Sequence, residues 1–81
     1  MVASIAMEND ELVVSLDDVE QAEMGRAANI EIELLRKLTR LRTFRGLIEG
    51  KHFQFRRDKS TMADYEVAKD VLRGFCLWSG S

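Results

Sequence analysis

Residues 27–49 read AANIEIELLRKLTRLRTFRGLIE, and this stretch decides the fold that the sequence predicts. Apolar residues recur in it at spacings of three and four, which is the period of one face of an α-helix. Gly50 follows at the position where a glycine commonly ends a helix. The pattern therefore predicts one long helix over about residues 27–49. Its apolar stripe consists of Ala27, Ile30, Leu34, Leu38, Leu41, Phe44 and Ile48.

A second helix is expected over about residues 62–77. Thr61 and Asp64 fit the capping-box pattern, in which two side chains three residues apart accept hydrogen bonds from each other's backbone N–H groups. The segment between the two helices is ambiguous, because Phe53 and Phe55 alternate as they would in a strand. No second strand is evident to pair with it, so we expect a connector or the fraying start of a helix there.

The fold class predicted from these patterns is all-α, an antiparallel helical hairpin that occupies residues 16–81. Residues 1–15 are expected to form a flexible, acidic N-terminal segment, partly disordered or folded as a short extra element. Within it, residues 1–10 have no strong periodicity and are expected to be mobile and dispensable for folding. The chain contains no proline, and we expect no internal repeat.

The apolar face of the second helix is wider than one neighbouring helix can cover. A single partner helix covers a stripe of roughly 100°, whereas the apolar arc here takes up about half the circumference. An uncovered apolar patch marks an interaction surface, although the N-terminal segment around Leu12, Val14 or Leu16 could instead fold over it. The predicted partner-binding residues are Val67, Val71 and Trp78, with Phe53 and Phe55 at the end of the hairpin.

Charge is sorted along the chain. Residues 1–33 hold nine acids against one base, whereas residues 34–59 hold nine bases against two acids. The candidate basic patch comprises Arg36, Arg40, Arg42, Arg56 and Arg57. On a helical wheel the bases of the first helix spread around its circumference, which argues against a stripe that follows a phosphate backbone. Nucleic-acid binding is therefore kept as the alternative to protein binding.

Several function classes lack the residues that they need. One cysteine, Cys76, excludes a disulfide within the chain, and one histidine, His52, leaves too few ligands for a structural zinc site. We predict no catalytic residue, no metal, no cofactor and no enzymatic activity. The start of the chain lacks a basic, apolar leader pattern and no apolar run is long enough to cross a membrane, so a cytoplasmic location is expected.

The layout resembles a known family. A Leu-Leu-x-x-Leu-x-x-Leu pattern over residues 34–41 leads to Gly50-Lys51, then to the triplet Phe53-Gln54-Phe55, and finally to the closing amphipathic helix. This is similar to the small co-chaperones of type III secretion needle subunits, the YscE-like group. The resemblance implies a cytoplasmic helical hairpin that pairs with a tetratricopeptide-repeat chaperone and helps to hold the needle subunit unpolymerised.

Two functions are carried forward from the sequence. The first is a small protein–protein interaction module or co-chaperone that buries an apolar helix face on a partner, either a helical-repeat chaperone or a second copy. The alternative is a small regulator of phage, plasmid or bacterial origin that acts through its basic middle segment on nucleic acid or on the transcription machinery.

Overall fold

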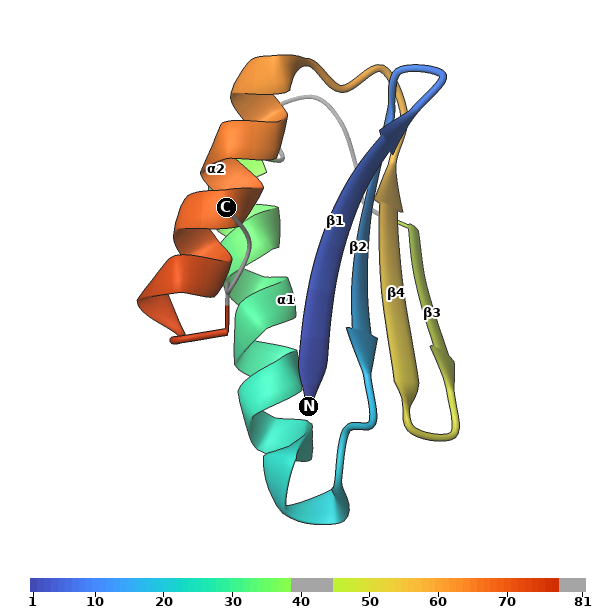
Figure 1. Ribbon diagram of the computed structural model, residues 1–81, viewed down its shortest axis with the longest axis vertical. Coiled ribbons are helices and arrows are strands. Elements are labelled where there is room, and N and C mark those ends of the chain that lie inside the picture. Colours follow the sequence, from blue (N-terminus) through green and yellow to red (C-terminus); the bar gives the residue numbers. More distant parts are fainter. Residues whose placement is uncertain (39–44, 78–81) are drawn as a thin grey trace.

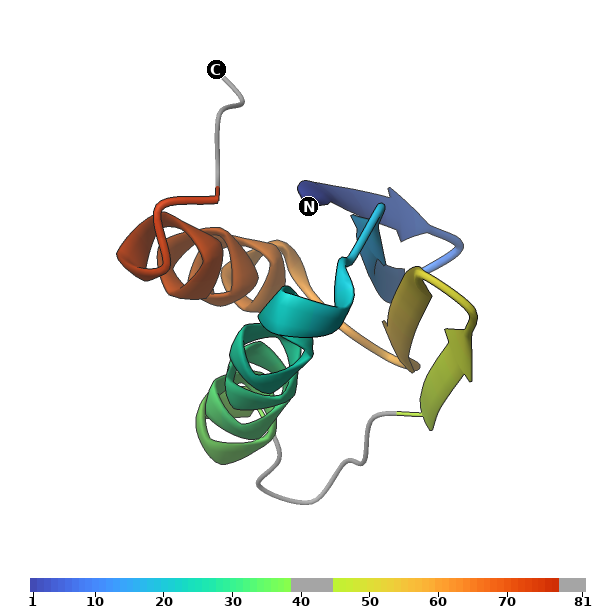
Figure 2. The same ribbon diagram turned by 90° about the horizontal axis from the view of Figure 1, so that it is seen from below.

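Two β-hairpins and two α-helices alternate along the chain in the computed structural model, which describes residues 1–38 and 45–77 (Figure 1). The elements are β1 (Val2–Glu8), β2 (Glu11–Asp17), the short 3₁₀ helix η1 (Gln21–Glu23), α1 (Met24–Leu38), β3 (Arg45–Glu49), β4 (His52–Arg57) and α2 (Met62–Gly74). The four strands form one antiparallel sheet in the order β1-β2-β4-β3. Both helices pack on the same side of this sheet, so the domain has two layers (Figure 2).

Each hairpin has a two-residue turn whose backbone suits the twist of the strands. Asn9 and Asp10 both have positive φ values, 51° and 63°, as a type I′ turn requires. In the second hairpin Gly50 has a φ of 60° at the first turn position, where type II′ turns favour glycine. Gly50 is therefore a turn residue between two strands and not the end of a helix.

The core lies between the sheet and the helices, and strand alternation sends side chains into it. In β2 the residues Leu12, Val14 and Leu16 are fully buried, and Phe53 and Phe55 of β4 lie opposite Leu16 and Val14. Phe55 is the largest of the fully buried side chains. The helices complete the core with Ala27, Ile30, Leu34 and Leu38 from α1 and Ala68, Val71 and Leu72 from α2.

The all-α prediction is wrong, because residues 1–17 form the β1–β2 hairpin and the first helix ends at Leu38. The stripe that predicted a helix over residues 27–49 continues to Ile48 by coincidence of spacing. Ile48 lies in β3 opposite Phe53, so its apolar character belongs to a strand. Two further members of the predicted stripe, Leu41 and Phe44, fall outside the described residues.

The predicted start of the second helix is confirmed. The Thr61 Oγ1 atom accepts a hydrogen bond from the Asp64 N–H, and an Asp64 carboxylate oxygen accepts one from the Thr61 N–H at 2.9 Å. This capping box satisfies backbone donors that the first turn of α2 would otherwise leave unpaired. The helix ends at Gly74, short of the expected residue 77.

Thr61→Ala should lower the free energy of unfolding by about 1 kcal/mol, the usual effect of losing a side-chain N-cap. Urea denaturation followed by circular dichroism measures this change. Thr61→Ser keeps the hydroxyl and is the matched control, which we expect to unfold close to the parent. An unchanged midpoint for Thr61→Ala would show that this cap contributes nothing.

The chain repeats one ββα unit with an offset of 41 residues, as equivalent positions show. Asp18 and Lys59 share positive φ values of 56° and 55°. The next residue in each unit, Val19 or Ser60, donates its N–H to the second turn residue of the other hairpin, Lys51 or Asp10. A capping box then starts each helical segment, at Glu20 and at Thr61. We call residues 1–38 the first unit and residues 45–77 the second unit.

Candidate interaction surface

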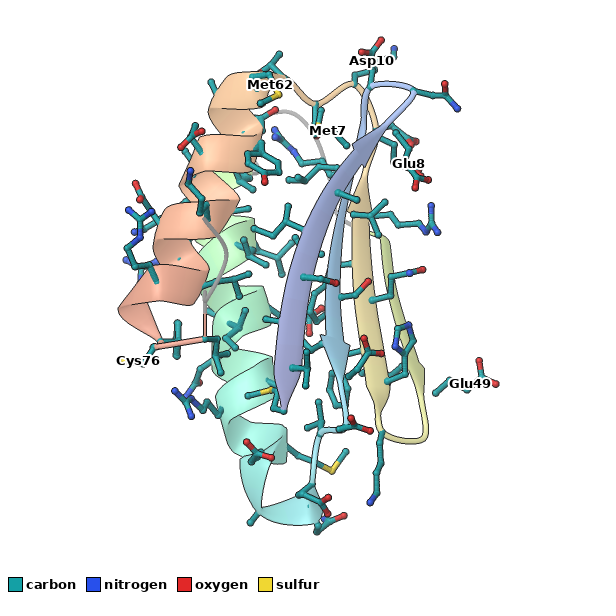
Figure 3. The ribbon with its side chains drawn as sticks, in the orientation of Figure 1. Met7, Glu8, Asp10, Glu49, Met62 and Cys76 are labelled. Atoms are coloured by element: carbon teal, nitrogen blue, oxygen red, sulfur yellow. The ribbon has the colours of Figure 1, made fainter. Side chains whose placement is uncertain are left out.

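The side of the sheet opposite the helices is covered by no described element (Figure 2). We call it the open face. Figure 3 shows Met7 turned toward the helices, whereas Glu8 and Glu49 point away from them. The open face consists of Val2, Ser4, Ala6 and Glu8 on β1, Glu11, Val13, Ser15 and Asp17 on β2, His52, Gln54 and Arg56 on β4, and Glu49 on β3.

The centre of the open face is neutral and made of short side chains. Ser4 lies opposite Ser15, and Ser15 lies opposite Gln54, so three polar uncharged residues form one row across three strands. Ala6 and Val13 form the neighbouring row, in which Val13 is buried although it faces away from the helices. This centre carries hydroxyl and amide groups that can donate and accept hydrogen bonds.

An arginine–glutamate ion pair and a histidine–aspartate contact flank this centre, one toward each end of β2 and β4. Arg56 Nη1 lies 2.5 Å from Glu11 Oε1, and Arg56 Nε donates a hydrogen bond of 3.0 Å to the Gln54 side-chain oxygen. At the other end, His52 Nδ1 contacts Asp17 Oδ1. The described charged groups nearest the centre are thus already paired with each other.

These contacts join acids of the first unit to bases of the second. Glu11–Arg56 and Asp17–His52 both cross from β2 to β4, and Lys51 Nζ lies 3.3 Å from Glu20 Oε1 at the end of the sheet. The acids and bases that are separated along the sequence therefore contact each other in the folded molecule. It gives the two units complementary charges where they meet.

Those predicted partner-binding residues that the structure describes do not form a surface. Phe53 and Phe55 are 4% and 1% exposed on the helix side of β4, and Val71 is 4% exposed in the core. Val67 packs partly buried against the same core, and Trp78 lies outside the described residues. The arc of α2 that a second helix could not reach is covered by the sheet, because α2 packs against β1 and β2 as well as α1.

The predicted basic patch does not assemble among the described residues. Arg36 is exposed on α1 and pairs with Glu33 at 2.8 Å, while Arg56 lies on the open face. Arg57 is 4% exposed on the helix side of β4, where its Nη1 atom lies 2.8 Å from Asp64 Oδ2. These three guanidinium groups occupy three different parts of the molecule. Arg40 and Arg42 fall outside the described residues.

Other parts of the described chain offer little for ligand chemistry. A shallow cleft of about 200 Å³ between α1 and α2 is lined by Glu33, Lys37, Asp70, Val71, Gly74 and Phe75. Cys76 is free and exposed, and residues 1–38 and 45–77 bring together no group of three metal-ligating side chains. Within the same residues, neither helix has the length and apolar character that crossing a bilayer requires.

Fold and surface together define the class of this protein, a two-layer α+β domain built from two ββα units with one uncovered sheet face. A scan against protein-family models finds no match, and no curated protein or solved structure matches the chain. The helical hairpin that the resemblance to needle co-chaperones implied is not the observed fold. No residue role is therefore carried over from that group.

Sequence reasoning missed the open face because its residues come from strands that were not recognised. The available signals were the alternation of Leu12, Val14 and Leu16 and the Asn9-Asp10 turn that precedes them. Read as a hairpin, these signals place Ser4 and Ser15 on the surface of a sheet.

Proposed function

We propose that this chain is a small protein-binding module that acts in the cytoplasm and docks its open face on another protein. The single observation that carries the proposal is the sheet face that no described element covers, with a neutral centre between the Arg56–Glu11 ion pair and the His52–Asp17 contact. A sheet with only one face packed on a core presents the other to solvent or to a partner. Flat sheet faces pack well against a second sheet or a helix layer.

Burying this face should cost little free energy of desolvation. Unpaired charges are expensive to remove from water, but Arg56 and His52 already have acidic partners. Ser4, Ser15 and Gln54 can exchange water for hydrogen bonds to a partner, and Ala6 and Val2 add apolar area. Val2 is 57% exposed, so it gains most from being covered.

The same charges support protein binding over nucleic-acid binding. Phosphate contacts need cations gathered on one face, whereas the side chains that the structure describes on the open face include four acids, Glu8, Glu11, Asp17 and Glu49, and the guanidinium group of one arginine. That arginine, Arg56, is held by Glu11. A labelled oligonucleotide of mixed sequence should therefore show no salt-sensitive binding in fluorescence anisotropy.

A crosslinking pull-down with three baits tests the proposal. The baits are the parent chain, Ser15→Arg at the centre of the open face, and Asn29→Arg on the exposed side of α1, used in a lysate of the organism that encodes the chain. The parent and Asn29→Arg should capture the same protein, and Ser15→Arg should lose it, because the long cation prevents close approach to the sheet. Circular dichroism first establishes that both variants are folded.

A protein captured equally by all three baits would place the binding site elsewhere. A parent chain that captures no protein, or that binds the oligonucleotide with strong salt dependence, would also contradict the proposal.

A further inference from the structure

The β1 strand forms one edge of the sheet and carries none of the usual devices that prevent edge-to-edge pairing. It pairs with β2 without a bulge from Val2 to Glu8, and it contains no proline and no lysine. Its one charge, Glu8, stands at the hairpin end. Long, regular edge strands of this kind are templates for pairing with another strand.

The outer edge of β1, which pairs with no other described strand, presents backbone groups from its inward-facing residues. In a two-residue hairpin the closing pair, here Glu8 and Glu11, exchanges hydrogen bonds, and so does every second pair beyond it. The backbones of Ala3, Ile5 and Met7 therefore point outward, away from β2. Their side chains pack only partly buried against the core, so the apolar layer of the domain extends to this edge.

The sequence of β1 is complementary to itself when two copies run antiparallel with Ile5 opposite Ile5. This register places Ala3 opposite Met7 on the helix side, so apolar residues meet apolar residues. On the open face it places Ser4 opposite Ala6 and Val2 opposite Glu8, so no like charges in β1 stand directly opposite each other. The outward-facing backbone groups of Ala3, Ile5 and Met7 then all form hydrogen bonds with the β1 strand of the second copy.

We propose that two copies of this chain pair through their β1 edges in this register, forming one eight-stranded sheet with a continuous double open face. This inference rests on the proposed function, because the dimer doubles the area of open face that is available for docking on a partner. With about 3.4 Å per residue and 4.8 Å between strands, one open face offers roughly 400 Å². Stable protein interfaces bury about 800 Å² on each partner, which two faces side by side provide.

The opposite edge, β3, is the less suitable partner strand. It has five residues, includes Gly46, and ends at the charged residue Glu49. By the same alternation, only Gly46 and Ile48 have backbones that point outward from β3. These two positions allow fewer backbone hydrogen bonds than the three of β1. Pairing through β1 is therefore favoured over pairing through β3.

Sedimentation equilibrium of the purified chain tests the dimer, over a concentration series spanning two decades around roughly 10 µM. We expect a reversible dimer. The double variant Ser4→Lys/Ala6→Lys places two lysines directly opposite two lysines of the second copy, and it should weaken dimerisation by at least about tenfold. Both positions are exposed, so the monomer should remain folded.

Charge exchange tests the register itself. Ser4→Glu/Ala6→Glu should also be monomeric, but an equimolar mixture with the lysine variant should form heterodimers, because each Lys then faces a Glu. Ala28→Lys/Asn29→Lys, on the exposed side of α1, adds the same charge away from the edge and should dimerise like the parent. Added salt should tighten the parent dimer, since it screens the repulsion between two acidic first units.

A parent chain that remains monomeric across the series would overturn the dimer. Full dimerisation of the lysine variant, or a mixture that stays monomeric, would overturn the β1 register. These outcomes are independent of the proposed function, because the Ser15→Arg pull-down detects open-face binding whether the bait is a monomer or a dimer.

Discussion

Deletion of residues 1–10 should abolish cooperative folding. The deletion removes β1, which pairs with β2 along seven residues and covers the core with Ala3, Ile5 and Met7. Partial burial of these apolar side chains contributes about 2–3 kcal/mol, a large share of the total of about 4–12 kcal/mol expected for a domain of this length. It also removes the Asp10 carbonyl that accepts from the Ser60 N–H. Thermal unfolding followed by circular dichroism is the measurement.

Val2→Ser is the matched control for the deletion. Val2 is 57% exposed and lies on the same strand, so its truncation should shift the melting temperature by only a few degrees. A deletion variant that kept a cooperative transition near that of the parent would show that β1 is not an integral strand. That result would restore the sequence-based expectation that the segment is dispensable.

Asp64→Ala should lower the free energy of unfolding by about 3–5 kcal/mol, the range for leaving a buried charge without its partner. The Arg57 side chain is 5% exposed and that of Asp64 is 18% exposed. Among the described residues, Arg57 Nε and Nη1 have no hydrogen bond of acceptable geometry, so this guanidinium depends on the nearby carboxylate. Asp64 also caps α2, which adds to its effect. Urea denaturation gives the free energies.

Two further variants separate the charge from the cap. Arg57→Met in the Asp64→Ala background should recover most of the lost stability, because an unbranched apolar side chain occupies the buried space without a charge. Thr61→Ala disrupts the cap alone and should cost only about 1 kcal/mol. If Asp64→Ala cost no more than Thr61→Ala, the buried ion pair would contribute nothing to stability.

Local signals in the sequence predicted the features that depend on neighbouring residues. The Thr61 capping box and the start of α2 depend on contacts within a few residues, and both were correct. The sheet depends on β2 meeting β4, where Leu16 lies opposite Phe53 although the two residues are far apart in sequence. A single sequence contains no direct sign of that pairing. The sequence patterns therefore gave no partner strand for β2 or for β4.

The first helix shows how two periodicities can be confused. Leu34 and Leu38 belong to α1, and the spacing to Ile48 happens to continue their stripe into β3. The candidate surface was lost for the same reason. The residue types of Ser4, Ser15 and Gln54 carry no signature, and only the register of the sheet brings them into one row.

The opposite charges of the two units also bear on which strands can associate during folding. Antiparallel pairing of β2 with the β2 of another molecule, centred on Val14, would place the acids Glu11 and Asp17 opposite each other. Like charges in facing positions disfavour this encounter. The pattern of acids followed by bases therefore favours pairing of a first unit with a second unit over pairing of two first units. This preference reduces one kind of mispairing between newly made chains.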